Sequence, residues 1–179
     1  MLTSLAAGAY LLHIRQRNNT KNGVIFTSSN RVILLPEKWV GCRFPILPYL
    51  DHGRQISSGK WTVVFFRRNC SKCDEILPKY IKRACRSESS TAFIELPVDA
   101  SGPYDRRAPF TIDPRKTQAP TVMASLNNRY DWLVETPFEV TVNNGMTVSA
   151  AGADALSARM DASSDNSFVH ATDSATTIK

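Results

Sequence analysis

The sequence predicts an α/β domain, and three observations carry this prediction. Residues 61–66 form a run of β-branched and aromatic side chains, Trp-Thr-Val-Val-Phe-Phe, which is the composition of a buried central strand. Apolar residues recur at helical spacing over residues 70–85. Two alternating segments, 138–142 and 146–148, flank an Asn-Asn-Gly turn, which is typical of a β-hairpin. A strand, an amphipathic helix and a hairpin together indicate a sheet packed against helices.

Shorter segments supply the remaining expected strands. Residues 24–26 and 31–35 form two extended runs in an ambiguous lead-in. Residues 92–96 are expected to form a second strand of the sheet, and residues 121–126 an edge strand. The segment 131–134 then leads to a Thr-Pro pair just before the hairpin.

The chain divides into three parts by composition. It has 179 residues, 42% of them hydrophobic, which is enough for one domain with a proper core. We expect an N-terminal apolar helix and variable lead-in over residues 1–38, the folded domain over 39–152, and a low-complexity, disordered tail over 153–179. The tail is assigned from its Ala, Ser, Asp and Thr content, which offers few large apolar side chains to bury.

The N-terminal apolar run covers residues 2–14 and is followed at once by Arg15 and Arg17. A membrane-spanning helix needs about twenty apolar residues, so this run is too short to cross a bilayer alone. It also lacks the basic region that precedes the apolar part of a signal peptide. Two interpretations stay open: a surface or core-packing helix, and the end of a membrane helix that begins outside this chain. Membrane association through residues 2–14, and a membrane-associated or extracytoplasmic location, depend on the second.

Charge and cysteine content narrow the classes of function. The formal net charge is +6, and residues 1–86 hold fifteen Lys and Arg against four Asp and Glu. These cations are scattered among apolar segments and form no run or stripe, so we expect no nucleic-acid partner. Four cysteines are too few for a disulfide-stapled mini-protein at this length. Redox or metal chemistry is favoured.

The chemistry is expected at Cys-Ser-Lys-Cys, residues 70–73, where the helix begins. At a helix start the sulfur of Cys70 meets free backbone amides and the positive end of the helix dipole, which favour the thiolate. Cys70 is therefore the predicted nucleophile. Cys73 lies one turn away, close enough to attack a mixed disulfide on Cys70, and is the predicted resolving thiol. Asn69 is the expected N-cap, and Pro78 is expected to kink the helix.

Three cations lie close to the dithiol along the chain: Arg67, Arg68 and Lys72. Any one that points inward would stabilise the thiolate, so we expect the pKa of Cys70 to lie below the ordinary thiol value of about 8.5. A stabilised thiolate also makes the dithiol more oxidising. These residues are the predicted thiolate-tuning groups.

A structural zinc site is the alternative for this cysteine pair, but it needs four ligands. The further cysteines, Cys42 and Cys85, are distant along the chain, and three histidines are scattered at His13, His52 and His170. The sequence holds no second pair of this spacing, so we expect no metal or other cofactor at the dithiol. For Cys85, a buried apolar role is favoured over that of an extra resolving thiol.

The segment from about residue 40 to 150 resembles the thioredoxin superfamily, in particular its membrane-linked thiol-disulfide oxidoreductases and its redoxin-type branch. The lead-in residues Gly41 and Pro45, the Gly-Lys plus apolar strand at 59–66, and Pro78 five residues after the second cysteine carry the resemblance. It implies a thioredoxin-like mixed sheet flanked by helices. Domains of this kind also extend helical membrane redox proteins of the DoxX or methylamine-utilisation type.

The pair Thr136-Pro137 resembles the cis-proline loop of the same family. The resemblance implies that Pro137 is cis, that the loop lies opposite the dithiol, and that Thr136 and Pro137 bind the extended substrate. Ala119-Pro120 is the rival position, but no Asn-Gly hairpin follows it closely.

The chain departs from the family pattern in several places. Asn69 replaces the usual aromatic residue before the first cysteine, and Val64 stands where thioredoxin has a buried carboxylate. Proton handling at Cys73 must therefore differ, through water or through the nearby Glu75. A peroxiredoxin-type peroxidase is not favoured, because Arg67 occupies the position of that family's Thr.

The resemblance implies a thiol-disulfide oxidoreductase or electron carrier, with a redox-active Cys-x-x-Cys dithiol that exchanges disulfides with a cysteine-containing partner protein. An alternative of another class stays open: a thioredoxin-fold module that binds Cu or Zn between two soft thiolates, or that interacts without catalysis. The direction of electron flow does not follow from the sequence, since it depends on the contacts that set the potential.

Overall fold

The computed structural model describes residues 22–68, 70–86, 89–96, 117–156 and 158. The expected apolar helix at residues 2–14 and most of the tail from residue 153 lie outside these ranges, so neither prediction is tested. No helix in the described part of the chain is long and apolar enough to cross a bilayer.

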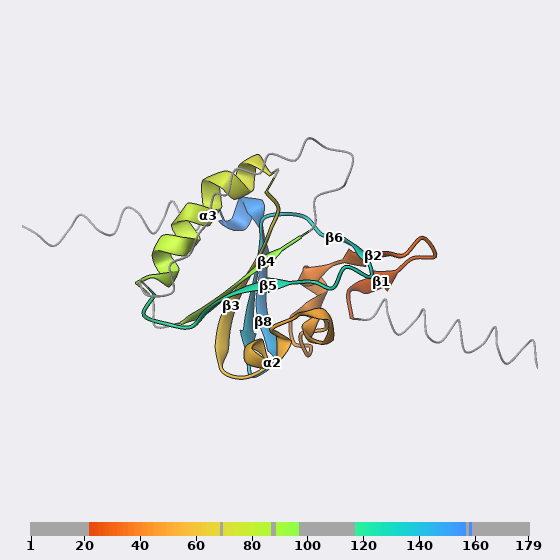
Figure 1. Ribbon diagram of the computed structural model, residues 1–179, viewed down its shortest axis with the longest axis horizontal. Coiled ribbons are helices and arrows are strands. Elements are labelled where there is room, and N and C mark those ends of the chain that lie inside the picture. The colour runs from red at the N-terminus through yellow and green to blue at the C-terminus, as the bar shows by residue number, and fades with distance from the viewer. Residues whose placement is uncertain (1–21, 69, 87–88, 97–116, 157, 159–179) are drawn as a thin grey trace, which may run out of the picture.

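The described residues form two sheets, one long helix and several short helical turns (Figure 1). In chain order the elements are β1 (Val24–Phe26), β2 (Arg31–Leu34), the 3-10 helices η1 (Pro36–Trp39) and η2 (Leu47–Tyr49), α2 (Gly53–Ile56), β3 (Lys60–Phe66), α3 (Ser71–Ala84), β4 (Ser90–Glu95), β5 (Thr121–Ser125), β6 (Asp131–Leu133), β7 (Phe138–Asn143) and β8 (Met146–Gly152). Residues 153–156 continue as a helical turn.

The larger sheet has the strand order β5-β4-β3-β7-β8. Strand β3 pairs in parallel with β4, to which α3 connects it, and β4 pairs in parallel with β5. On its other side β3 pairs antiparallel with β7, which forms the expected hairpin with β8. The predicted mixed α/β fold is confirmed: a parallel strand–helix–strand unit followed by an antiparallel hairpin resembles the thioredoxin fold. The predicted edge strand is β5.

Strand β3 lies at the centre because both of its faces are apolar. Its side chains alternate between the two sides of the sheet, as in any strand. Val64 and Phe66 belong to a buried cluster with α3, while Val63 and Phe65 belong to the core on the opposite face. These four side chains are at most 2% exposed. The composition of residues 61–66 therefore predicted the central strand correctly.

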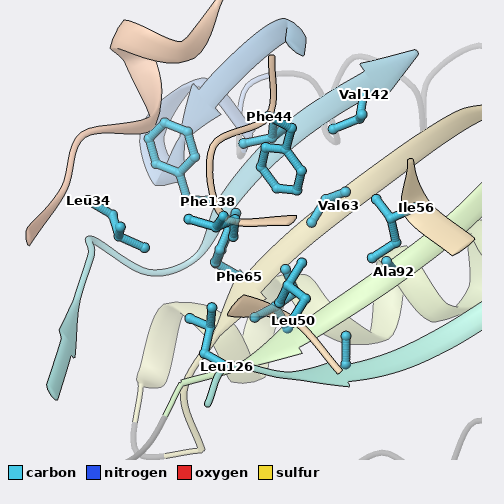
Figure 2. Close-up of a cluster of buried hydrophobic side chains, with 14 of the residues drawn as sticks. Leu34, Phe44, Leu50, Ile56, Val63, Phe65, Ala92, Leu126, Phe138 and Val142 are labelled. Carbon is cyan, nitrogen blue, oxygen red and sulfur yellow. The ribbon is translucent and has the colours of Figure 1, made fainter. Parts of the chain in front are cut away.

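The face of the sheet away from α3 carries the larger core (Figures 1 and 2). Among the described residues, this core is covered by η1, η2, α2 and the small sheet. The labelled members of this core in Figure 2 are all apolar: Leu34, Phe44, Leu50, Ile56, Val63, Phe65, Ala92, Leu126, Phe138 and Val142. The sequence predicted helices on the flanks of the sheet, and on this flank the helical segments are only three or four residues long.

The small sheet has the order β1-β2-β6 and brings together distant parts of the chain. Strand β2 pairs in parallel with β6, and Arg31 forms an ion pair of 3.2 Å with Asp131 across the two strands. The side chains of Val24 and Leu34 lie in the same core as Trp39. The strands expected in the lead-in before residue 39 thus exist and pack with the domain.

The hairpin turn has the geometry that its residues favour. Asn144 and Gly145 have φ values of 49° and 76°. Two successive residues with positive φ are what a tight turn needs to match the right-handed twist of its strands, and Asn-Gly tolerates them best. The predicted hairpin is confirmed.

Candidate functional site

Helix α3 begins directly at the dithiol, and the first cysteine is its N-cap. Cys70 has an extended backbone, and its Sγ accepts a hydrogen bond from the backbone N–H of Cys73 at 3.2 Å. The prediction of Asn69 as N-cap is therefore wrong, because the sulfur itself occupies the capping position; Asn69 lies outside the described residues. The amide that was expected to favour a thiolate on Cys70 does point at this sulfur.

The two sulfurs of Cys70 and Cys73 lie at disulfide-bond distance, and their Cα atoms are 5.1 Å apart. The two cysteines differ in exposure: Cys73 is fully buried, whereas Cys70 is partly exposed. A partner can therefore reach the sulfur of Cys70 and not that of Cys73. The roles of nucleophile and resolving thiol stay predictions, and the two cysteines differ in exposure in the sense that those roles require.

The helix behind the dithiol is amphipathic as expected. Pro78 lies within α3 at an exposed position. The buried face consists of Cys73, Ile76, Leu77, Tyr80 and Ala84. This face packs on β3 and β4, and it holds the N-terminus of α3 at the end of β3.

The segment before β7 lies against the dithiol. The peptide bond between Thr136 and Pro137 is cis, as expected from the sequence, while the rival bond before Pro120 is not. The carbonyl oxygen of Thr136 lies 3.4 Å from Sγ of Cys70, within reach of a hydrogen bond from the reduced thiol. The fold thus brings Thr136 and Cys70 together although they are 66 residues apart.

Two of the predicted thiolate-tuning cations form ion pairs with carboxylates. Arg68 binds both carboxylate oxygens of Glu95, the last residue of β4, with its Nε and Nη2. Lys72 donates to Asp154 at 3.0 Å on the exposed surface of the protein. The positive charge of each side chain is thus offset by a nearby negative charge.

Arg67 has a neutral partner instead. Its Nη2 donates to the backbone carbonyl of Trp132 at 3.2 Å, and its Nε is buried without a hydrogen-bond partner among the described residues. Arg67 also lines a cleft of about 490 Å³ between the small sheet and the segment that leads to Pro137. The cleft includes Glu135 and Phe138, which flank the Thr136-Pro137 pair.

Sequence reasoning missed a buried carboxylate near the dithiol. Glu139 on β7 is 8% exposed, and the hydroxyl of Tyr80 on α3 donates a hydrogen bond to its Oε2. Glu139 lies directly opposite Val64 in the sheet, and Val64 stands at the sequence position where thioredoxin has its buried carboxylate. Glu75, the sequence-based candidate for proton handling, is exposed.

The reason for the omission is the pattern of β7 itself. The strand alternates Phe138, Glu139, Val140 and Thr141, which is typical of a strand with one face in water. The available signal was indirect: a strand that pairs with the central strand β3 is also covered by the helix on its other face. A carboxylate at such a position must be buried.

The described residues also bear on metal binding, which needs a group of ligating side chains. In the ranges that the structure describes, no three His, Cys, Asp or Glu side chains come together in a group that could hold a metal ion. Cys42 and Cys85 are free thiols, each half-buried.

Comparison with known proteins finds similarity among solved structures but none to a family model or a curated sequence. No protein-family model and no curated protein matches the sequence. Among solved structures, the chain is similar to the exposed lipoprotein thioredoxin Etrx1 of Streptococcus pneumoniae, with 13% identity and a TM-score of 0.40. The alignment covers 61% of this chain and 88% of the other. The function is therefore argued from the geometry of the dithiol alone.

Proposed function

We propose that the protein is a thiol-disulfide oxidoreductase or electron carrier, whose dithiol exchanges disulfides with a cysteine-containing partner protein. One observation supports this most strongly: the partly exposed Cys70 caps α3 at disulfide distance from the fully buried Cys73. A disulfide between these two cysteines would add little to the stability of the fold, because a loop closed over four residues removes little entropy from the unfolded state.

In the reducing direction, the Cys70 thiolate attacks a disulfide of the partner. A bond forms between Cys70 and one partner sulfur, and the other partner sulfur leaves as a thiolate that takes a proton from water. Cys73 then gives up its proton and attacks the sulfur of Cys70, which releases the second partner thiol. The partner disulfide gains two electrons and two protons, and the Cys70–Cys73 disulfide forms. The oxidising direction is the reverse.

We assign partner binding to Thr136 and Pro137. The carbonyl of Thr136 is already in contact distance of Cys70, so a chain that lies along this segment has its cysteine beside the reactive sulfur. In the family that the chain resembles, this loop holds an extended peptide beside the reactive sulfur, and we carry that role over to Thr136 and Pro137. The cleft beside Glu135 offers room for a neighbouring side chain of the partner.

The test is a disulfide-exchange assay with a model protein disulfide and a thiol donor. C70S should reduce the rate to that measured without the protein. C73S should still attack but should accumulate a mixed disulfide, which is visible on a non-reducing gel.

The matched controls are C42S and C85S, which remove the other two thiols of the chain and should keep the exchange rate. Exchange that survives in C70S contradicts the proposal. Copper or zinc retained after purification, with no exchange by the wild-type protein, would support the metal-binding alternative instead.

A further inference from the structure

We propose that Glu139 accepts the proton of the Cys73 thiol when Cys73 resolves a mixed disulfide, and that Tyr80 holds the carboxylate in place. This inference deepens the proposed function and rests on it. It concerns a group outside the Cys-x-x-Cys motif and its flanking cations, carried by the strand that follows the Thr136-Pro137 segment.

The first argument is the burial of Glu139. Among the described residues, the buried polar side chains are Thr91, Glu139 and Thr147, so Glu139 is the one buried carboxylate there. A carboxylate in an apolar interior destabilises the fold unless hydrogen bonds compensate. Buried ionisable groups beside a reactive centre are therefore candidates for a chemical role.

The second argument is the position of Glu139 in the sheet. The strand registers place Phe93, Val64, Glu139 and Ala151 side by side across four strands. The three apolar members of this row belong to the cluster that packs against α3. Since paired residues point to the same side of a sheet, Glu139 also points toward α3.

Helix α3 carries Cys73 and Tyr80 on the face that packs against this side of the sheet. Cys73 and Tyr80 are seven residues apart, two turns of the helix, and both are buried in the cluster that contains Val64. The side chain of a helical residue leans toward the N-terminus of its helix, so the ring of Tyr80 extends toward Cys73. Its hydroxyl donates to Glu139, which holds the carboxylate in the layer that contains the Cys73 sulfur.

The third argument is the need for a base. Cys73 is 0% exposed, so bulk water does not reach its sulfur in the folded protein. In the proposed step the proton moves from the Cys73 thiol to the Glu139 carboxylate. The thiolate attacks the Cys70 sulfur, the Cys70–Cys73 bond forms, and the partner leaves as a thiolate. In the reverse direction Glu139 returns the proton.

Two titratable side chains of α3, Cys73 and Tyr80, belong to the cluster on the side of the sheet to which Glu139 points, and the strand neighbours Val64 and Ala151 do not titrate. The experiment follows the resolving step: a mixed disulfide is formed between Cys70 and a small aromatic thiol, and release of that thiol is timed from about pH 6 to about pH 9. In E139Q the release should be about 10²-fold slower near neutral pH. The difference should narrow as the pH approaches the ordinary thiol pKa of about 8.5, because a growing fraction of the Cys73 thiol is then ionised before the resolving step and needs no base.

The matched control is E75Q, which removes a carboxylate only two residues from Cys73 but on the exposed side of α3. It should follow the wild-type profile. E139Q keeps an amide oxygen that can accept from Tyr80, and its thermal unfolding curve checks that it folds. Y80F keeps the carboxylate and loses the hydroxyl that positions it, so its release should be slowed less than in E139Q and should keep the pH dependence of the wild type.

Three outcomes overturn the inference: a wild-type profile in E139Q, the same change in E139Q and Y80F, or a change in E75Q that matches that in E139Q. In each of these cases wild-type exchange and its loss in C70S would stand, so the proposed function would survive. Failure of the wild-type protein to exchange disulfides at all would instead refute the proposed function.

Discussion

The two faces of the five-stranded sheet are built from the same strands but differ in chemistry. The face away from α3 packs aromatic and aliphatic side chains, Phe44 and Phe65 among them, against the lead-in and the small sheet (Figure 2). Trp39 and Trp132 are also fully buried in this core. The face toward α3 holds a smaller cluster that includes a sulfur, and beside it a hydrogen-bonded tyrosine and carboxylate.

The two faces therefore contribute differently to stability and to chemistry. Burial of apolar area is the main source of folding free energy, and the larger core supplies most of it. The smaller cluster gives up some of that energy to hold ionisable groups. We therefore expect substitutions on the first face to change stability alone, and substitutions on the second to change the chemistry of the dithiol and, by a smaller amount, stability.

The largest effect on stability is expected for F44A. Phe44 is 1% exposed, and its ring packs edge-on against Trp39 with centroids 5.5 Å apart. Its truncation should lower the free energy of unfolding by about 3–5 kcal/mol, through lost apolar contact and the cavity left behind. Denaturant unfolding measures this loss. The exchange rate of the folded fraction should stay unchanged, and a parallel fall in that rate would break the separation of the two faces.

A smaller effect is expected for the pair on the α3 face. Y80F removes the hydroxyl that donates to Glu139 and should cost about 1–3 kcal/mol of unfolding free energy. The double variant Y80F/E139L removes both polar groups and should recover most of this loss. Denaturant unfolding of both variants tests this. No recovery in the double variant would mean that the carboxylate stabilises the fold through other contacts.

The smallest effect is expected for the cations around Cys70. Lys72 forms an ion pair with Asp154, whereas Arg67 donates its hydrogen bond to the uncharged backbone carbonyl of Trp132. R67Q should therefore raise the pKa of the reduced Cys70 thiol more than K72Q does, with an effect of at most about 1 kcal/mol. The pH dependence of alkylation in a C73S background measures it. Equal effects of the two substitutions would refute this ranking.

Local features of the sequence carried most of the fold prediction. The strand at 61–66, the amphipathic helix after it and the Asn-Gly turn each depend on neighbours within a few residues, and all three are confirmed. The small sheet could not be predicted, because β2 and β6 pair across 100 residues of chain. Strands of three or four residues contain too few alternating positions to identify the distant strand with which they pair.

The candidate site divides in the same way. The sequence by itself determined the Cys-x-x-Cys motif and the helix that begins at it, because spacing and residue type are local properties, whereas the cis bond before Pro137 was expected only from the family resemblance. Only the tertiary structure decided the partners of the three cations and the burial of Glu139 under α3. The physical reason is that the surroundings of a side chain depend on strand register and on what covers the strand, and both are set by residues far away in the chain.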